Sequence, residues 1–383
     1  SNPFKQSIAE FRSPWMMGGR FTSPGLAILV YQIYSFVLLA LIAATIRKRQ
    51  LHDLIIAGAF FYLSATALRN ISLFMLATLP IAAASWSDVS WRGIRNGLSS
   101  LLSRPAAAWV TVVIALVLFA RTVTNAQYIA QGRIERFGIG LDGETQPSGA
   151  AAFLVTNHLD GRILNQMNTG GWLDWTRTGQ VFIDGRTEVM GEGLFVESMS
   201  SLQPGGLARL IAAYRPDILL FTPATARQWV LDLNGMPEWR LAFLDEGAAV
   251  FLRAGYAPAI PPEATAAILS ARGLTMDAGG RAAALLREAP PTAWQSAVDS
   301  LYRPAVHPNG LQAMALLFQY RNEPQASEAL FVECLERSRR RYYDFYFNAG
   351  LMYYGSGQSD KARLAMERVL ADDPENTGAR RIL

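Results

Sequence analysis

The sequence predicts an α-helical transmembrane bundle, then a small α/β domain, and then an all-α solenoid of helical repeats. Apolar residues are concentrated in residues 25–125 instead of being spread evenly over the 383-residue chain. From residue 150 onward, short apolar segments of different type follow one another, which is typical of a small layered domain. The carboxy-terminal part carries a regular pattern of small and large residues, typical of stacked helices. The expected divisions are a loop (1–24), about four transmembrane helices (25–126), a linker (127–149), the α/β domain (150–256) and the repeats (257–383).

The transmembrane prediction depends on three apolar stretches. Gly25–Ile46 is long enough to cross a hydrocarbon core of about 30 Å. Leu54–Ala84 is too long for one straight helix, so it is expected to form two short spans joined near Arg69. A fourth span is expected over Ala106–Val123. Membrane lipid is therefore the first expected partner.

Basic residues near the span ends predict the orientation, because cytoplasmic loops are enriched in Lys and Arg. If the chain alternates through four crossings, two basic clusters fall on the same side, namely Arg47, Lys48 and Arg49, and then Arg92, Arg95 and Arg104. That side is expected to be the cytoplasm. The first loop and the α/β domain are then extracytoplasmic.

The α/β domain is predicted from its alternation of helix-like and strand-like segments. Its expected elements are a helix over Ala150–His158, a strand at Ile163-Leu164, a turn at Gly170-Gly171, a strand at Val181–Ile183, a helix over Leu207–Tyr214, a strand over Ile218–Phe221, a helix over Ala224–Leu233, and strands over Arg240–Leu244 and Ala248–Leu252. A proline-rich segment, 257–262, is expected to close the domain, with few contacts crossing it.

The residue pattern of the carboxy-terminal part, 257–383, predicts a tetratricopeptide-like solenoid. Phe345–Pro374 matches the small-and-large pattern of that repeat, and Ala349, Gly350 and Ala362 would let two helices approach closely. A weaker copy contains Ala326, Ala329 and Leu330, and further helices are expected near 263–272, 279–288 and 292–303. Such a stack is by default a binding platform, so a protein partner is expected to bind the repeats.

Several classes of site are unlikely from the composition. The net charge is only +4 and the cations form no basic stripe with interleaved aromatics, so nucleic acid is not an expected partner. The three histidines, His52, His158 and His307, have no zinc-ligand spacing. Gly138–Gly143 fits a dinucleotide-binding pattern literally but lacks the flanking strand and helix, so it is expected to be a linker. The chain starts at Ser1 without a methionine, and we expect it to be the carboxy-terminal part of a longer protein.

Two sequence motifs resemble those of a membrane enzyme family. Ser7-Ile8-Ala9-Glu10 is similar to a motif in an external loop of the catalytic subunit of oligosaccharyltransferase. Gly171–Trp175 and Val181–Arg186 then resemble the start of that enzyme's soluble domain, in the same order. Together they resemble the GT-C class of membrane glycosyltransferases over roughly residues 1–255. The segment Trp172–Thr176 departs from the family's acceptor-reading signature, which implies a different acceptor.

The resemblance implies a transferase of the bacterial inner membrane that takes a sugar from a polyprenyl-phosphate donor. Glu10 is the candidate catalytic residue, either as a base or as a ligand of a divalent metal, and the sequence leaves the metal open. Arg12 and Arg69 are candidate substrate-binding cations, because a departing phosphate needs positive charge. Asp184 and Arg186 are candidates for acceptor contact or, alternatively, a paired turn. The competing hypothesis is a non-catalytic, membrane-anchored scaffold of the cell envelope.

Overall fold

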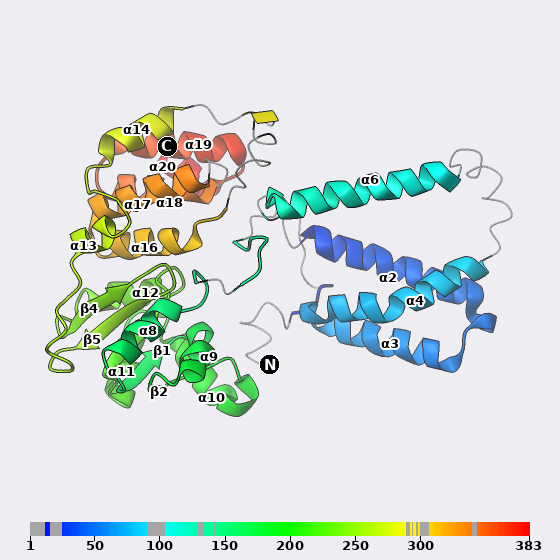
Figure 1. Ribbon diagram of the computed structural model, residues 1–383, viewed down its shortest axis with the longest axis horizontal. Coiled ribbons are helices and arrows are strands. Elements are labelled where there is room, and N and C mark those ends of the chain that lie inside the picture. The colour runs from blue at the N-terminus through cyan, green and yellow to red at the C-terminus, as the bar shows by residue number, and fades with distance from the viewer. Residues whose placement is uncertain are drawn as a thin grey trace. The chain divides into compact units, whose positions relative to one another are not determined.

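The computed structural model describes residues 12–15, 25–89, 104–126, 128, 134–140, 143–288, 292, 294–295, 298, 306–338 and 343–383. It is mostly helical, with 63% helix and a small mixed sheet (Figure 1). The chain divides into two compact units, of which the first is Ser1–Thr122 with Ala130–Arg133 and the second is Val123–Ile129 with Ile134–Leu383.

The first unit contains four apolar helices in its described part, namely α2 (Gly25–Thr45), α3 (Leu51–Thr66), α4 (Ile71–Asp88) and α6 (Arg104–Val123). Two helical stretches, Ile28–Lys48 and Leu68–Asp88, are long and apolar enough to cross a membrane. They extend α2 and α4 through the short 3-10 turns η2 (Ile46–Lys48) and η3 (Leu68–Asn70). Helix α3 has 16 residues and rises only about 24 Å at 1.5 Å per residue, which is short of a hydrocarbon core of about 30 Å.

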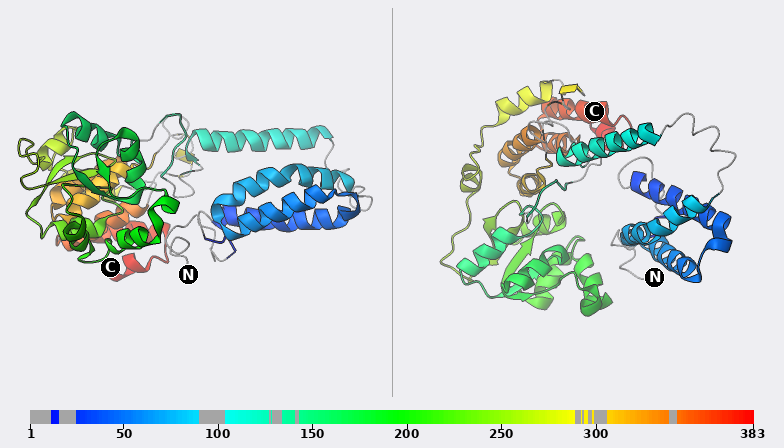
Figure 2. Two further views of the ribbon diagram at one scale, coloured as in Figure 1. Left: turned by 90° about the horizontal axis from the view of Figure 1, so that it is seen from below. Right: turned by 45° about the vertical axis from the view of Figure 1, so that its right-hand side comes forward.

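Helix α4 packs against both α2 and α3 (Figure 2). Their interior combines apolar side chains, such as Leu38 and Phe74, with buried hydroxyl groups. The Tyr31 and Ser64 hydroxyls, both fully buried, lie 3.0 Å apart, and the Tyr34 hydroxyl lies 2.9 Å from that of buried Thr78. In contrast, many large apolar side chains are exposed, such as Phe36 at 64% and Leu76 at 70%. Large exposed apolar surfaces of this kind mark sites that contact a membrane or another protein.

Polar contacts of Asp88 show which ends of α2, α3 and α4 lie together. Arg49, in the α2–α3 turn, forms a salt bridge with Asp88 at the end of α4, and the Lys48 ammonium donates to the Asp88 carbonyl at 3.1 Å. The start of α2 and the α3–α4 turn therefore lie at the opposite end. The basic cluster Arg47–Arg49 thus lies at the end where α4 finishes, as the orientation prediction requires of these three helices.

We predict that an impermeant thiol reagent will label the two ends differently. In a Cys334→Ser background, Ile139→Cys should be labelled on intact cells, because Ile139 is fully exposed after the last apolar helix. His52→Cys should be spared, because this exposed residue lies beside the basic α2–α3 turn. Both sites should react after the membrane is permeabilised. Labelling of His52→Cys alone would reverse the orientation.

The second unit begins with a five-stranded mixed sheet of order β2-β1-β3-β5-β4. Its strands are β1 (Arg162–Asn165), β2 (Gln180–Val181), β3 (Ile218–Phe221), β4 (Trp239–Leu244) and β5 (Ala249–Arg253). Strands β2, β1 and β3 are parallel, whereas β5 runs antiparallel to both β3 and β4. The strands expected at 163–164, 218–221, 240–244 and 248–252 are confirmed, and the strand expected at 181–183 is reduced to the pair Gln180-Val181.

Helices cover both faces of this sheet. Ile163, Ile218 and Leu220 pack on one face with residues of α8 (Ser148–Thr156) and α9 (Met167–Thr176). On the other face, Leu219, Phe221 and Phe251 pack with residues of α11 (Gly206–Tyr214) and α12 (Arg227–Leu233). The helix α10 (Thr187–Ser200) connects β2 to α11 along the chain. The expected helices at 150–158, 207–214 and 224–233 are thereby confirmed within a few residues.

The expected turn at Gly170-Gly171 is wrong, because both glycines lie inside α9. A Cβ on Gly170 would collide with the Ile183 carbonyl and the Asp184 backbone, whereas one on Gly171 would meet nothing within 4 Å. Gly170 is therefore present because the helix passes directly over the segment that follows β2. Two adjacent glycines suggested a turn, but the close approach of the backbones explains the first of them.

The regular elements described in the carboxy-terminal part are all helices. Its helices are α13 (Thr265–Ser270), α14 (Gly279–Arg287), α16 (Asn309–Tyr320), α17 (Pro324–Arg337), α18 (Tyr343–Gly355), α19 (Ser359–Asp372) and α20 (Thr377–Ile382). Helices α16 and α17 form one hairpin, and α18 and α19 form another. A Cβ on Gly350 would lie 3.2 Å from the Ala365 Cβ and 2.6 Å from the Met366 methyl, so α18 and α19 approach closely at this position. The helix expected over 292–303 lies largely outside the described residues.

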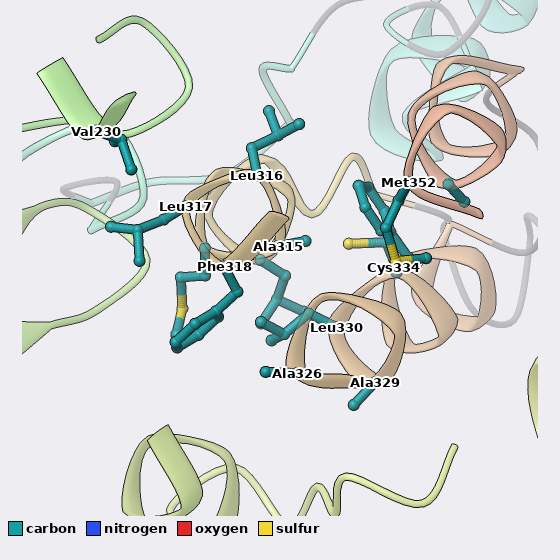
Figure 3. Close-up of a cluster of buried hydrophobic side chains, with 14 of the residues drawn as sticks. Val230, Ala315, Leu316, Leu317, Phe318, Ala326, Ala329, Leu330, Cys334 and Met352 are labelled. Carbon is teal, nitrogen blue, oxygen red and sulfur yellow. The ribbon is translucent and has the colours of Figure 1, made fainter. Parts of the chain in front are cut away.

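The boundary expected at 257–262 does not separate two cores. One buried cluster runs from the sheet through α12 into α16, α17, α18 and α19. Figure 3 shows Leu317 of α16 lying beside Val230 of α12. The Asn234 side chain also donates to the Tyr320 carbonyl at 2.8 Å. The expectation of few contacts across this boundary is therefore wrong, because prolines mark the turn in the chain but not the limit of the buried surface.

Candidate functional site

The carboxyl ends of the three parallel strands carry a cluster of polar residues. Asn165 ends β1, Asp184 follows β2, and Thr222 directly follows β3. All three are buried, with at most 9% of their surface exposed. In open α/β sheets this edge is where ligands bind, because the strands end there and helices begin. The helices α9, α10 and α12 follow these three strands in turn.

Asn165 holds the segment before Asp184 in place. Its amide nitrogen donates to the Ile183 carbonyl at 2.8 Å, and its amide oxygen accepts from the Phe182 amide at 3.0 Å. The side chain thus continues the pairing that β2 makes with β1 after the regular strand has ended. Gln166 extends the same network, because its side-chain oxygen accepts from the Thr222 amide and the Thr225 hydroxyl, both at 3.0 Å.

Asp184 and Arg186 form the paired turn that was one of the two sequence hypotheses. The Asp184 carboxylate accepts from the Arg186 backbone amide at 2.8 Å and from its Nε at 2.7 Å. The side-chain hydrogen bond from Arg186 lowers the pKa of Asp184 despite the burial of its carboxyl group. A carboxylate with a lowered pKa is a poor proton acceptor, so Asp184 is suited to anchoring the loop and not to acting as a base.

Arg186 reaches beyond this turn to α9. Its Nη2 lies 2.9 Å from the Asp174 carboxylate, and both side chains are more than half exposed. Together they line an open hollow of about 720 Å³ whose lining residues are Gly171, Asp174, Trp175, Arg177, Asp184, Gly185 and Arg186. Trp175 is 82% exposed. An exposed indole beside an ion pair offers a stacking face together with hydrogen-bond donors and acceptors, a combination suited to a polar ligand such as a sugar.

Arg12 and Arg69 lie together in the first unit. The Leu68 amide donates to the Arg12 carbonyl at 3.0 Å, and the Ser13 hydroxyl donates to the Ala65 carbonyl at 2.7 Å. These bonds fix the segment before α2 against the turn between α3 and α4. Both arginine side chains are exposed at this end of the helical group. Two cations separated by 56 residues in the sequence are thus neighbours in the fold.

The candidate residues therefore fall into two groups, Arg12 with Arg69 in the first unit and Asp184 with Arg186 in the second. Glu10 lies outside the described residues. Among the residues that the structure describes, no group of three His, Cys, Asp or Glu side chains could hold a metal ion. Asn165, Gln166 and Trp175 were not predicted as site residues, although a polar pair directly after a buried strand was visible in the sequence.

No protein-family model matches the chain, and neither a curated protein nor a solved structure shows a match.

Proposed function

We propose that this chain is part of a GT-C-type membrane glycosyltransferase that moves a sugar from a polyprenyl-phosphate donor to an extracytoplasmic acceptor. The observation that carries the proposal is the bond between the Arg12 carbonyl and the Leu68 amide. It brings two exposed guanidinium groups to the end of an apolar helical group, where a lipid phosphate would lie. The bacterial inner membrane, with the second unit outside the cytoplasm, is part of the same proposal.

The chemistry assigns a separate task to each group of residues. The departing polyprenyl phosphate carries negative charge, and guanidinium groups stabilise it through charge-assisted hydrogen bonds. The proposed catalytic carboxylate, Glu10, precedes Arg12 by two residues in the sequence. The hollow beside Trp175 and Arg186 is proposed to contact the acceptor, and the helical hairpins α16–α17 and α18–α19 to recruit a protein partner.

An arginine exchange at each end of the helical group tests the donor site. Arg69→Ala should lower transfer from a polyprenyl-phosphate sugar by about a hundredfold, a typical loss when one stabilising donor is removed from an anionic transition state. Arg47→Ala is the matched control, because Arg47 is also exposed but lies at the opposite end. Transfer is measured with radiolabelled donor in membranes from cells expressing the full-length gene. Equal losses in both variants would contradict the assignment of Arg69.

A non-catalytic envelope scaffold is the second candidate. It is favoured by the ion pair of Asp184, which has a structural task, and by the continuous core that joins the sheet to the helical hairpins. A scaffold would bind its partner equally well with or without a functional loop at Arg12. Unchanged envelope assembly in a strain carrying both Arg12→Ala and Arg69→Ala would favour the scaffold.

A further inference from the structure

An apolar groove lies between α2 and α3 in the first unit. Its volume is about 280 Å³, and its lining residues are Trp15, Ser35, Phe36, Leu38, Leu39, Ile42, Leu54, Ala57, Gly58, Phe61 and Phe74. Apart from the Trp15 indole, the only polar side chain in this lining is that of Ser35. Its hydroxyl donates a hydrogen bond to the Tyr31 carbonyl at 2.8 Å. Phe74 of α4 is fully buried and contributes to the floor. The groove therefore suits a hydrocarbon and offers a polar ligand almost nothing.

Trp15 closes one end of the groove. Its ring makes edge contacts with Tyr31, Phe36 and Phe61 at centroid distances of 5.8, 5.9 and 6.4 Å. Its Nε1 lies 3.3 Å from the Tyr31 hydroxyl. A tryptophan held in this way, with an apolar body and a polar tip, is typical of the level where hydrocarbon meets the polar interface.

Gly58 leaves the middle of the groove open. A Cβ at this position would meet nothing within 4 Å. Glycine inside a helix costs up to about 1 kcal/mol relative to alanine, and here no packed neighbour requires it. The open face of Gly58 gives a chain-like ligand room to lie against the α3 backbone.

The charges at the Trp15 end define the head group of the ligand. Arg12 is three residues before Trp15, and its backbone is bonded to Leu68, the neighbour of Arg69. An amphiphile that lies in the groove with its head at this end would present that head to two exposed guanidinium groups. Guanidinium groups bind phosphate with particular strength, because their paired donors match its oxygens.

We propose that this groove binds the hydrocarbon chain of a polyprenyl phosphate, with the phosphate at the Arg12 and Arg69 end. The proposal rests on the proposed function for the identity of the head group, and it adds the place where the chain lies. Binding of the chain needs no transfer reaction. The groove and the catalytic assignment can therefore fail independently.

Photo-crosslinking of the full chain in nanodiscs tests the groove. The probe is a polyprenyl phosphate with a diazirine in the isoprenoid units next to the phosphate, and adducts are mapped by mass spectrometry. We expect adducts on the α2 segment around Phe36–Leu39 and on the α3 segment around Gly58–Phe61. Unlabelled polyprenyl phosphate should compete, and a diazirine phosphatidylcholine should label these positions much less.

Substitutions at Gly58 make the test specific. Gly58→Phe should fill the groove and lower labelling by about tenfold, the factor expected if about two methylene-sized groups lose their burial. Gly58→Leu should lower it less, and this second variant keeps the test valid if the larger one misfolds. Ala59→Phe is the control, because Ala59 is the exposed next residue of α3 and does not line the groove.

Three outcomes would overturn the groove assignment. They are equal labelling by the phosphatidylcholine probe, labelling unchanged in both Gly58 variants, and adducts confined to helices other than α2 and α3. If labelling follows the prediction but the protein transfers no sugar, the groove stands and the catalytic proposal fails.

Discussion

Replacing Gly170 by alanine is expected to destabilise the second unit, whereas the same change at Gly171 is not. The added methyl group at position 170 would overlap the Ile183 carbonyl and the Asp184 backbone, which are main-chain atoms and cannot rotate away. Asn165 holds this segment by hydrogen bonds to both Phe182 and Ile183, so a shift would also break that clamp. Overpacking of this kind costs about 1–3 kcal/mol, and the rigid backbone places this site at the upper end.

Gly171→Ala is the matched control for this substitution. It lies in the same helix, and its Cβ would enter open space. Alanine should even stabilise α9 by up to about 1 kcal/mol, because glycine is the poorer helix former. Thermal unfolding of the purified full chain, followed by circular dichroism, compares the two variants. Equal melting temperatures would show that α9 does not lie directly over residues 183 and 184.

Truncation after Pro262 is expected to unfold the α/β part as well. The removed helices cover Trp229, Val230 and Leu233, which belong to the cluster shared with α16 and α17. Each large apolar side chain that becomes exposed costs about 1.5–3 kcal/mol, and the net stability of a domain is only about 5–15 kcal/mol. Loss of several such contacts therefore removes most of the free energy of unfolding. The truncated chain should be degraded or aggregate, and its remaining second unit should be cleaved rapidly by protease.

Truncation after Asp372 provides the control for this experiment. It removes α20, in which Ala379 alone is buried, and leaves the hairpins α16–α17 and α18–α19 intact. This shorter deletion should keep a protease-resistant second unit. A stable, compact product of the Pro262 truncation would restore the separable boundary that the prolines suggested.

The sequence predicted the regular elements well where apolar runs were bounded by turn residues. The buried strand Ile218–Phe221 and the closing strand pair were placed within one or two residues, because strongly apolar segments of that length have few alternatives. The apolar helices were located by the same reasoning. The sequence did not predict that the Ser64 and Thr78 hydroxyls are buried between these helices, because each stands as a single small polar residue in an apolar stretch.

Contacts between distant segments could not be predicted from one sequence. The hydrogen bond from the Leu68 amide to the Arg12 carbonyl joins backbone atoms and leaves no trace in side-chain identity. The Asn165 side chain is visible in the sequence, but its partners Phe182 and Ile183 lie 17 and 18 residues away. The core that crosses the proline-rich segment likewise joins segments that are distant in the sequence. Local patterns encode helices and strands, whereas closure of long loops is decided by packing over the whole unit.

The proposed transfer reaction is tested most directly by donor turnover in proteoliposomes. The full-length protein is supplied with a polyprenyl-phosphate sugar carrying a radiolabel, and release of the sugar from the lipid is followed over time. Wild-type protein should consume the donor, and Glu10→Gln should consume almost none at the same expression level, because the amide can neither accept a proton nor bind a metal as a carboxylate does. Turnover by Glu10→Gln at the wild-type rate, or no turnover by the wild type with any sugar donor of this class, would contradict the proposal.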